Sequence, residues 1–155
     1  MLVLCTGNSA RSILAEYLIN KRGAGRFEAH SAGAAPSGRV HPLSLWVLRE
    51  RFGIDAGGAR SKSWDEFRDT AFDLIITVCD NARESCPVWP GKPVVAHWGS
   101  PDPAALEGTH EEKQRMFVDV AVQISRRVDL LCALADAAFN QRALDEIGRS
   151  GQWDG

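Results

Sequence analysis

The 155-residue chain has no long apolar segment, little net charge and only four cysteines. No apolar run approaches the roughly 20 residues that a membrane-spanning helix needs. Residue 1 leads straight into an apolar segment, without the basic start of a secretion signal. A formal net charge of −2 gives no reason to expect a nucleic acid. We therefore expect a cytoplasmic protein with no membrane and no nucleic-acid partner.

The chain also lacks internal repeats, low-complexity tracts and linkers, and it contains no Gly-Lys-Ser/Thr phosphate loop. Its length predicts one domain over residues 1–150, with a frayed tail at residues 151–155. Cysteines in the cytoplasm are more often reduced, catalytic or metal-binding than joined in structural disulfides. The few cysteines are therefore candidates for chemistry.

Short apolar runs alternate with amphipathic segments along the chain. Strands are expected at residues 2–5, 27–32, 72–79 and 94–98, and the clearest of them do not alternate in polarity, as in strands buried on both faces. Helices are expected after residue 12, over 42–52, from a Thr109/Glu112 capping box to about 131, and over 142–147. This order predicts a doubly wound α/β fold with a parallel sheet.

The parallel sheet brings chemically capable residues together. Cys5 ends the first expected strand, Cys79 ends the third, and Asp102 follows the fourth. Because ligands of open α/β sheets bind beyond the carboxyl ends of the strands, we expect these three side chains at one edge.

The segment Cys5–Ser12 contains a cysteine, five small or polar residues, an arginine and a serine, between a strand and a helix. Such a loop can wrap its N–H groups around a tetrahedral oxyanion, and Arg11 can add a bidentate contact. The same groups are expected to lower the pKa of Cys5 and make it a thiolate nucleophile. The alternative is a tight glycine turn with a buried cysteine.

Asp102 lies between two prolines, in a turn that could present its carboxyl to a leaving oxygen as a general acid. Its alternative role is that of an ordinary Asx-turn residue.

Cys79 and Cys86 stand seven positions apart. In a continuous helix their Cα atoms would lie about 10.5 Å apart, whereas a disulfide needs roughly 4.4–6.8 Å. Either the pair is never bridged, or the segment between the two cysteines rearranges when it is. A zinc site with His97 or His110, and an inert buried pair, are the other possibilities.

The remaining candidates are expected to be structural. Trp46 and Trp64 are predicted to pack, His30 and His41 to have satisfied local roles, Cys132 to join the core, and Arg126 and Arg127 to lie on a solvated helix face.

The loop Cys5–Ser12, the His30-Ser31-Ala32-Gly33 strand end, the Cys79/Cys86 pair and the Asp102-Pro103 turn together resemble the low-molecular-weight tyrosine phosphatase superfamily. The resemblance is greatest to its arsenate reductase branch of the thioredoxin-coupled type. The cysteine pair and Pro103-Ala104-Ala105, which lacks the aromatics that hold phosphotyrosine, favour the reductase. The resemblance implies a three-layer sandwich whose four-stranded parallel sheet has the strand order 2-1-3-4.

The resemblance also implies a mechanism. Arsenate would bind the loop residues Thr6, Gly7, Asn8, Ser9, Ala10 and Arg11, and Ser12 would hold the Cys5 sulfur as a thiolate. Cys5 would attack arsenic while Asp102 protonates the departing oxygen. Cys79 and then Cys86 would pass the oxidation outward.

No metal or organic cofactor is implied. The reductant is expected to be thioredoxin, or glutaredoxin with a low-molecular-weight thiol. A phosphatase acting on phosphotyrosine or small aryl phosphates is the alternative enzyme, and a redox sensor or metalloid-binding module is the non-catalytic alternative.

Overall fold

Four short parallel strands form the centre of this computed structural model, which describes residues 1–150. The strands are β1 (Leu2–Cys5), β2 (His30–Gly33), β3 (Leu74–Thr77) and β4 (Val94–His97). Their order across the sheet is β2-β1-β3-β4, and each neighbouring pair is parallel. The strand order implied by the resemblance is therefore confirmed. The tail expected at residues 151–155 lies outside the described residues.

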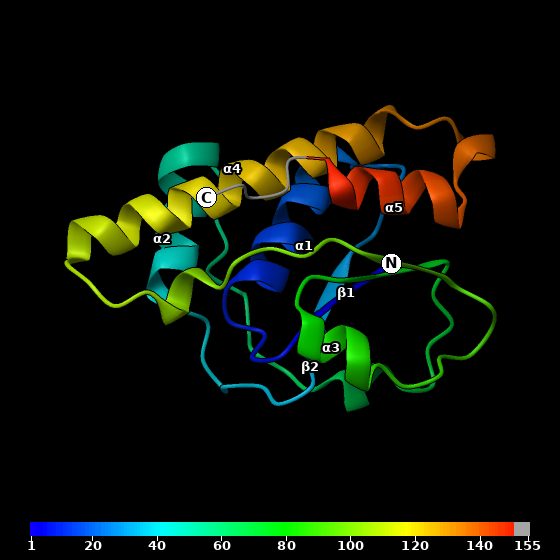
Figure 1. The fold of residues 1–155 in the computed structure, drawn as a ribbon, viewed down its shortest axis with the longest axis horizontal. Helices are drawn as coiled ribbons and strands as arrows, with labels where there is room; N and C mark the ends of the chain where they lie inside the picture. Colours follow the sequence, from blue (N-terminus) through cyan, green and yellow to red (C-terminus); the bar gives the residue numbers. More distant parts are fainter. Residues whose placement is uncertain (151–155) are drawn as a thin grey trace.

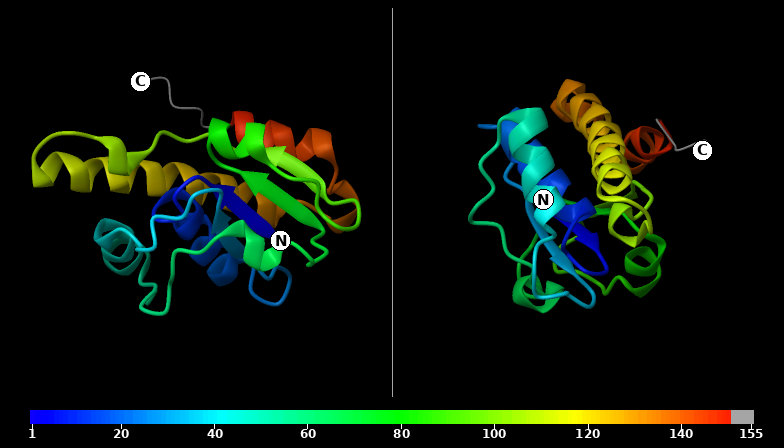
Figure 2. Two further views of the ribbon diagram at one scale, coloured as in Figure 1. Left: turned by 90° about the horizontal axis from the view of Figure 1, so that it is seen from below. Right: turned by 90° about the vertical axis from the view of Figure 1, so that its left-hand side faces the viewer.

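Helices cover both faces of the sheet. They are α1 (Arg11–Arg22), α2 (Pro42–Phe52), α3 (Asp80–Ser85), α4 (His110–Ala133) and α5 (Gln141–Arg149), with 3₁₀ segments at Trp64–Phe67, Pro103–Ala105 and Asp136–Ala138. In Figures 1 and 2, α1, α4 and α5 gather on one face, while α3 and the segment Trp64–Phe67 lie toward the other. This is the expected three-layer arrangement. Within residues 1–150, no helix is both long and apolar enough to cross a membrane.

The central strands are aliphatic on both faces because both faces are covered. Every residue of β1 and β3 is buried, and together they supply much of the core. The helix ends follow the predicted signals. The Thr109/Glu112 capping box starts α4, and Gly53, in the left-handed conformation (φ 64°), ends α2. The expected local role of His41 is also confirmed, since its Nδ1 accepts the N–H of Leu43 at the start of α2.

Strand β2 begins at residue 30, three residues later than the sequence predicts. The backbone of Ala29 bonds to the side chain of Asn20, which accepts its N–H at 2.8 Å and donates to its carbonyl at 2.9 Å. The N–H of Phe27 donates to the carbonyl of Gly23 in the turn after α1. These groups are therefore not available to the sheet.

Residues 80–85 form a helix rather than a loop. Cys79 is the residue before α3, and its sulfur accepts the N–H of Ala82 at 3.4 Å, while Cys86 follows the helix directly. Both cysteines are free thiols here. Bridging them therefore requires α3 to unwind, which corresponds to the rearrangement considered from the spacing.

Helix α5 packs closely on the carboxyl end of β4. A Cβ at Gly148 would overlap the carbonyl oxygen of His97, so only glycine permits this approach. The indole N–H of Trp98, just beyond β4, donates to the carbonyl of Leu144 at 3.0 Å. The last helix is therefore fixed beside the strand end that leads to Asp102.

Candidate active site

The loop between β1 and α1 turns its carbonyl oxygens away from its own centre. The carbonyls of Cys5, Thr6 and Gly7 accept hydrogen bonds from N–H groups in residues 34–37, and that of Ser9 accepts one from His41. Because the carbonyls are held outward, the N–H groups on the opposite side of the peptides turn inward. An oxyanion cradle requires this orientation.

The sulfur of Cys5 is held by two residues of this loop. The N–H of Asn8 donates to it at 3.1 Å, and the hydroxyl of Ser12 lies 2.8 Å away. The side-chain amide of Asn8 donates to Ser12 Oγ at 2.8 Å and to Ser31 Oγ at 3.0 Å, and its oxygen accepts the N–H of Lys62 at 2.9 Å. The side chain of Asn8 therefore fixes the hydroxyl that contacts the thiol.

This side-chain role of Asn8 was not predicted, because the sequence indicates only a backbone N–H group of Asn8 in an oxyanion-binding loop. Asn8 has a positive φ of 48°, a conformation that asparagine tolerates better than most residues. A buried ion pair also lies beneath the loop, where Lys62 Nζ is 3.9 Å from Glu16 Oε1. Burial lowers the pKa of Lys62 and raises the pKa of Glu16, and the charge of each partner opposes the shift.

Burial raises the pKa of the Cys5 thiol above its ordinary value. The hydrogen bonds with Ser12 and Asn8, and then the charge of Arg11, oppose this shift without outweighing the lost hydration. The predicted lowering of the Cys5 pKa is therefore wrong for this structure. The protonated Cys5 thiol can still transfer its proton to an oxyanion bound in the loop, because a doubly charged oxyanion is a base.

Arg11 and Asp102 meet at the mouth of the loop. One guanidinium nitrogen of Arg11 donates to the carbonyl of Ser100 at 3.0 Å, and another lies 3.8 Å from Asp102 Oδ2. The other carboxylate oxygen of Asp102 accepts the N–H of Ala104 at 3.0 Å. Asp102 therefore caps the turn that follows it, as the Asx-turn alternative predicts, and its carboxylate also lies near Arg11.

Cys79 lies against residues 6–10 between β1 and α1, here called the nucleophile loop because they follow the candidate nucleophile Cys5. Its sulfur is 3.3 Å from the hydroxyl oxygen of Thr6, the residue that follows Cys5. The side-chain amide of Asn81 in α3 donates to the same hydroxyl at 3.0 Å. The structure thus brings the first two cysteines of the predicted series to one place.

Cys86 lies at the opposite end of α3. Its sulfur accepts the indole N–H of Trp89 at 3.3 Å and lies 3.6 Å from the carbonyl oxygen of Pro87. Trp89 is buried, and its contact with Cys86 was not predicted from the sequence. Cys86 itself is half-buried, so it is more accessible than Cys79.

The zinc alternative has no support in the described part of the chain. Within residues 1–150, no three His, Cys, Asp or Glu side chains are grouped so that they could hold a metal ion. His97, one of the proposed ligands, lies 2.8 Å from the hydroxyl of Thr77 and 3.2 Å from the carboxylate of Asp80. Burial, and then the charge of Arg83, lowers the pKa of His97, which favours its neutral form.

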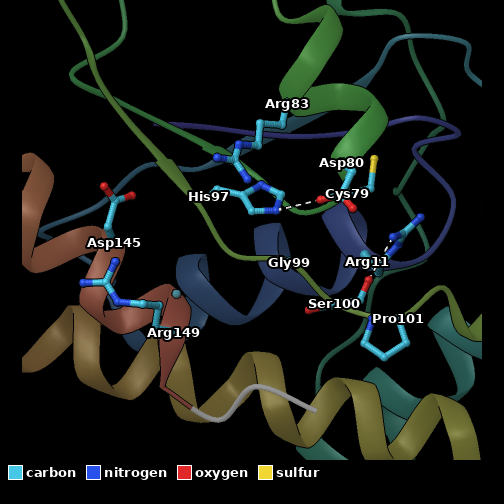
Figure 3. A pocket seen from close by; sticks show the side chains of 11 residues that line it. Arg11, Cys79, Asp80, Arg83, His97, Gly99, Ser100, Pro101, Asp145 and Arg149 are labelled. Atoms are coloured by element: carbon cyan, nitrogen blue, oxygen red, sulfur yellow. Dashed lines mark hydrogen bonds and ion pairs between the residues drawn. The ribbon is translucent and has the colours of Figure 1, made fainter. Parts of the chain in front are cut away.

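A cavity of about 790 Å³ opens where these elements meet. Figure 3 shows Arg83 and His97 on one side of it, and Asp145 and Arg149 on α5 on the other. Arg11 and Cys79 line its end nearest the nucleophile loop. The cavity was not predicted from the sequence, because one of its walls is formed by α5, a helix with no expected role.

Arg127 is buried, which corrects the prediction of a solvated helix face, although Arg126 is exposed as expected. The Arg127 guanidinium donates to the carbonyls of Gly99 at 2.9 Å, Gly148 at 2.8 Å and Ser150 at 3.2 Å. It therefore ties α4 both to the segment before Asp102 and to the end of α5.

Replacing Arg127 by methionine is expected to lower the free energy of unfolding by about 3 kcal/mol, because buried carbonyls lose their donors. Urea denaturation measures the change. Arg126→Met, at the exposed neighbouring position, is the matched control and is expected to change it by less than about 0.5 kcal/mol. Equal effects of the two substitutions would contradict the role assigned to Arg127.

The arrangement is typical of one class of protein, the enzymes that use a cysteine nucleophile in an oxyanion-binding loop: a cysteine sulfur beside inward N–H groups, with an arginine and a carboxylate next to them. Residues 1–138 match the family described as low molecular weight phosphotyrosine protein phosphatase. The chain belongs to this family.

Individual relatives point to one branch of the family. An arsenate reductase of Halalkalibacterium halodurans is 38% identical over 125 residues, which are 81% of this chain and 88% of that protein. The crystal structure of an arsenate reductase from Archaeoglobus fulgidus has 32% identity and a TM-score of 0.63, over 83% of this chain and 98% of that chain. The resemblance to the arsenate reductase branch is thus confirmed.

A third relative is named for its reductant. A thioredoxin-dependent arsenate reductase of Corynebacterium glutamicum has 30% identity and a TM-score of 0.57. The match covers 79% of this chain and 56% of that chain.

Proposed function

We propose that this protein reduces arsenate to arsenite by a series of thiol–disulfide exchanges through Cys5, Cys79 and Cys86. The observation that carries the proposal is the contact between the Cys79 sulfur and Thr6 in the nucleophile loop, 3.3 Å. A phosphatase needs one cysteine, whereas a reductase needs a second thiol within reach of the first. The arsenate reductases among its relatives support the same reaction.

In the first step, arsenate binds the inward N–H groups of residues 6–12 and the guanidinium of Arg11. The Cys5 thiol transfers its proton to the bound arsenate and its sulfur attacks arsenic, while Asp102 donates a proton to the departing oxygen, which leaves as water. The Ser12 hydroxyl, which accepts a hydrogen bond from Asn8, stays within hydrogen-bond distance of the Cys5 sulfur while the sulfur loses its proton and bonds to arsenic. The product is an arsenate ester of the Cys5 thiol.

In the second step, the Cys79 thiolate attacks the sulfur of Cys5. The electron pair of the sulfur–arsenic bond stays on arsenic, which is reduced from the +5 to the +3 state and leaves as arsenite. The two cysteines lose these electrons and form a Cys5–Cys79 disulfide. Cys86 then attacks Cys79, which releases the Cys5 thiolate and leaves a Cys79–Cys86 disulfide. This last exchange unwinds α3.

An external thiol donor restores the two cysteines. Thioredoxin, or glutaredoxin with a low-molecular-weight thiol, fits a reaction in the cytoplasm, where thiols are kept reduced. The thioredoxin-dependent relative supports a donor of this kind.

Phosphatase activity is a second candidate function, because Cys5, Arg11 and Asp102 would serve phosphoester hydrolysis in the same roles. The family model that matches residues 1–138 is described by that activity. The turn Pro103–Ala105 after Asp102 supplies no aromatic ring to hold phosphotyrosine, which disfavours it as the main reaction.

The test is consumption of reducing equivalents that depends on arsenate, with thioredoxin, glutathione plus glutaredoxin, and dithiothreitol supplied in turn. Arsenite is measured as the product, and hydrolysis of p-nitrophenyl phosphate is measured alongside. Multiple turnovers to arsenite with at least one donor are expected. Phosphate release without any arsenite would overturn the proposal in favour of the phosphatase.

A further inference from the structure

A buried ion pair lies beneath the nucleophile loop, outside the groups that the proposed reaction uses. The side chains of Lys62 and Glu16 are only 8% and 12% exposed, and Lys62 Nζ lies 3.9 Å from Glu16 Oε1. The ammonium of Lys62 also donates a hydrogen bond to the carbonyl of Arg60 at 3.2 Å. At 3.9 Å the two charges attract each other without a direct hydrogen bond. Both charges can therefore act on a third group nearby.

The segment that carries Lys62 is fixed to the loop. The backbone N–H of Lys62 donates to Asn8 Oδ1 at 2.9 Å, and the hydroxyl of Ser61 donates to the carbonyl of Gly7 at 2.9 Å. Asn8 in turn donates its own N–H to the Cys5 sulfur at 3.1 Å. One residue of the loop therefore links the backbone of Lys62 to the nucleophile.

Stability alone is a weak reason for a charged pair at this place. Burying two ions costs them their hydration, and apolar side chains of similar size often give a protein equal or greater stability. Burial lowers the pKa of Lys62, and the negative charges of Glu16 and of a Cys5 thiolate are among those that raise it. Because the attraction between two charges is mutual, a charged Lys62 favours the Cys5 thiolate to the same extent.

Charged and titratable groups from several elements surround the ion pair and the thiol. They are, in chain order, Arg11, His30, Arg60, Glu66 and Cys79. Arg60 and Glu66 are exposed and pair with each other at 2.6 Å, where water screens their charges. Arg11 lies at the mouth of the loop, beside Asp102. The ion pair acts from the opposite, buried side.

We propose that Lys62 is a positioning residue whose ammonium stabilises negative charge at Cys5 and in the nucleophile loop, and that Glu16 limits this effect. The negative charge is that of the Cys5 thiolate and of the oxyanion bound in the loop. The inference rests on the proposed function, in which Cys5 is the nucleophile, and it adds a cation that this reaction does not name.

The first test compares Lys62→Met, Glu16→Gln and the double variant that carries both substitutions. The rate at which iodoacetamide alkylates Cys5 is followed over a range of pH and is resolved from the other cysteines by mass spectrometry. At neutral pH, Lys62→Met is expected to react about tenfold more slowly than the unchanged protein, and Glu16→Gln about threefold faster. The double variant is expected to react within about twofold of the unchanged protein, because both carry no net charge at the pair.

Sulfate, a tetrahedral dianion that the thiols do not reduce, gives a second readout by isothermal titration calorimetry. Its affinity is expected to fall about fivefold in Lys62→Met and to rise about threefold in Glu16→Gln. Arg60→Met is the matched control, because Arg60 is an exposed cation in the same segment. The control is expected to change either readout by less than about twofold.

Opposite effects of the two single variants distinguish an electrostatic role from a structural one. If the pair only stabilised the fold, each single variant would leave a buried charge without its partner, and both would lose thiol reactivity. Equal or lower reactivity of Cys5 in Glu16→Gln, in protein that urea denaturation shows to be folded, would overturn the inference.

A charge-conserving variant decides the question if Glu16→Gln does not fold. Lys62→Arg keeps the positive charge and is expected to retain the alkylation rate within about threefold, whereas Lys62→Met loses it. Equal rates in these two variants would overturn the inference. If the unchanged protein reduces no arsenate with any donor, the proposed function fails, and alkylation and sulfate binding still decide the role of Lys62.

Discussion

Replacing Cys5 by serine is expected to abolish arsenate reduction, with a fall in rate of about 10⁴-fold or more. Serine keeps the size of the side chain and can still hydrogen-bond with Ser12 and Asn8, but its hydroxyl neither attacks arsenic as readily nor forms a disulfide with Cys79. The variant is therefore expected to fold and to bind oxyanions. Arsenite formation with dithiothreitol as donor measures the loss, and circular dichroism confirms the fold.

The control for this substitution is Cys132→Ser. Cys132 lies near the end of α4, where it is half-buried against the core and its carbonyl accepts a hydrogen bond from Arg26. Its replacement is expected to leave the rate of arsenate reduction within about twofold, because it removes no group from the site. Appreciable arsenite formation by Cys5→Ser would show that another group is the nucleophile.

Replacing Cys86 by serine is expected to separate the two candidate activities. Arsenate turnover with a thioredoxin or glutathione donor should fall about 100-fold or more, because the oxidation stays on the Cys5–Cys79 disulfide beneath α3. Hydrolysis of p-nitrophenyl phosphate should remain within about twofold, because Cys5, Arg11 and Asp102 are untouched. Steady-state rates of the two reactions in the same preparation measure the split.

The serine hydroxyl at position 86 can still accept the indole N–H of Trp89, so the surroundings of α3 are expected to persist. Loss of both activities together would indicate misfolding and is checked by thermal unfolding. Arsenate turnover that survives in a well-folded Cys86→Ser variant would exclude the last exchange step.

Features encoded by neighbouring residues were predictable from the sequence. The start of α4 and the end of α2 follow from a capping box and a glycine, which act within one turn of helix. The strand order and the meeting of Cys5, Cys79 and Asp102 at one sheet edge follow from the resemblance and from the geometry of parallel sheets.

Features that depend on distant partners were not predictable. In the sequence, Arg127 cannot be distinguished from an exposed arginine on a helix. It is buried because α5 packs beside the end of β4. The predicted start of β2 was too early, because the N–H of Ala29 donates a hydrogen bond to the side chain of Asn20 and not to a neighbouring strand. In both cases the deciding contact joins residues that sequence periodicity does not connect.

The sign of the Cys5 pKa shift was missed for a related reason. Hydrogen-bond donors and Arg11 can be read from the loop, and they act in the predicted direction. The burial that outweighs them depends on how the rest of the chain packs around the thiol. A sequence motif identifies the groups around a nucleophile, but the balance among them is a property of the packed site.

The most direct test of the cysteine series is a single turnover without added donor. The reduced protein is mixed with arsenate, quenched by alkylation and analysed by mass spectrometry, while released arsenite is counted. About one arsenite per chain, a Cys79–Cys86 disulfide and an alkylated Cys5 are predicted. Arsenite release with all of these cysteines alkylated, or no arsenite at all from the reduced protein, would contradict the proposed reaction.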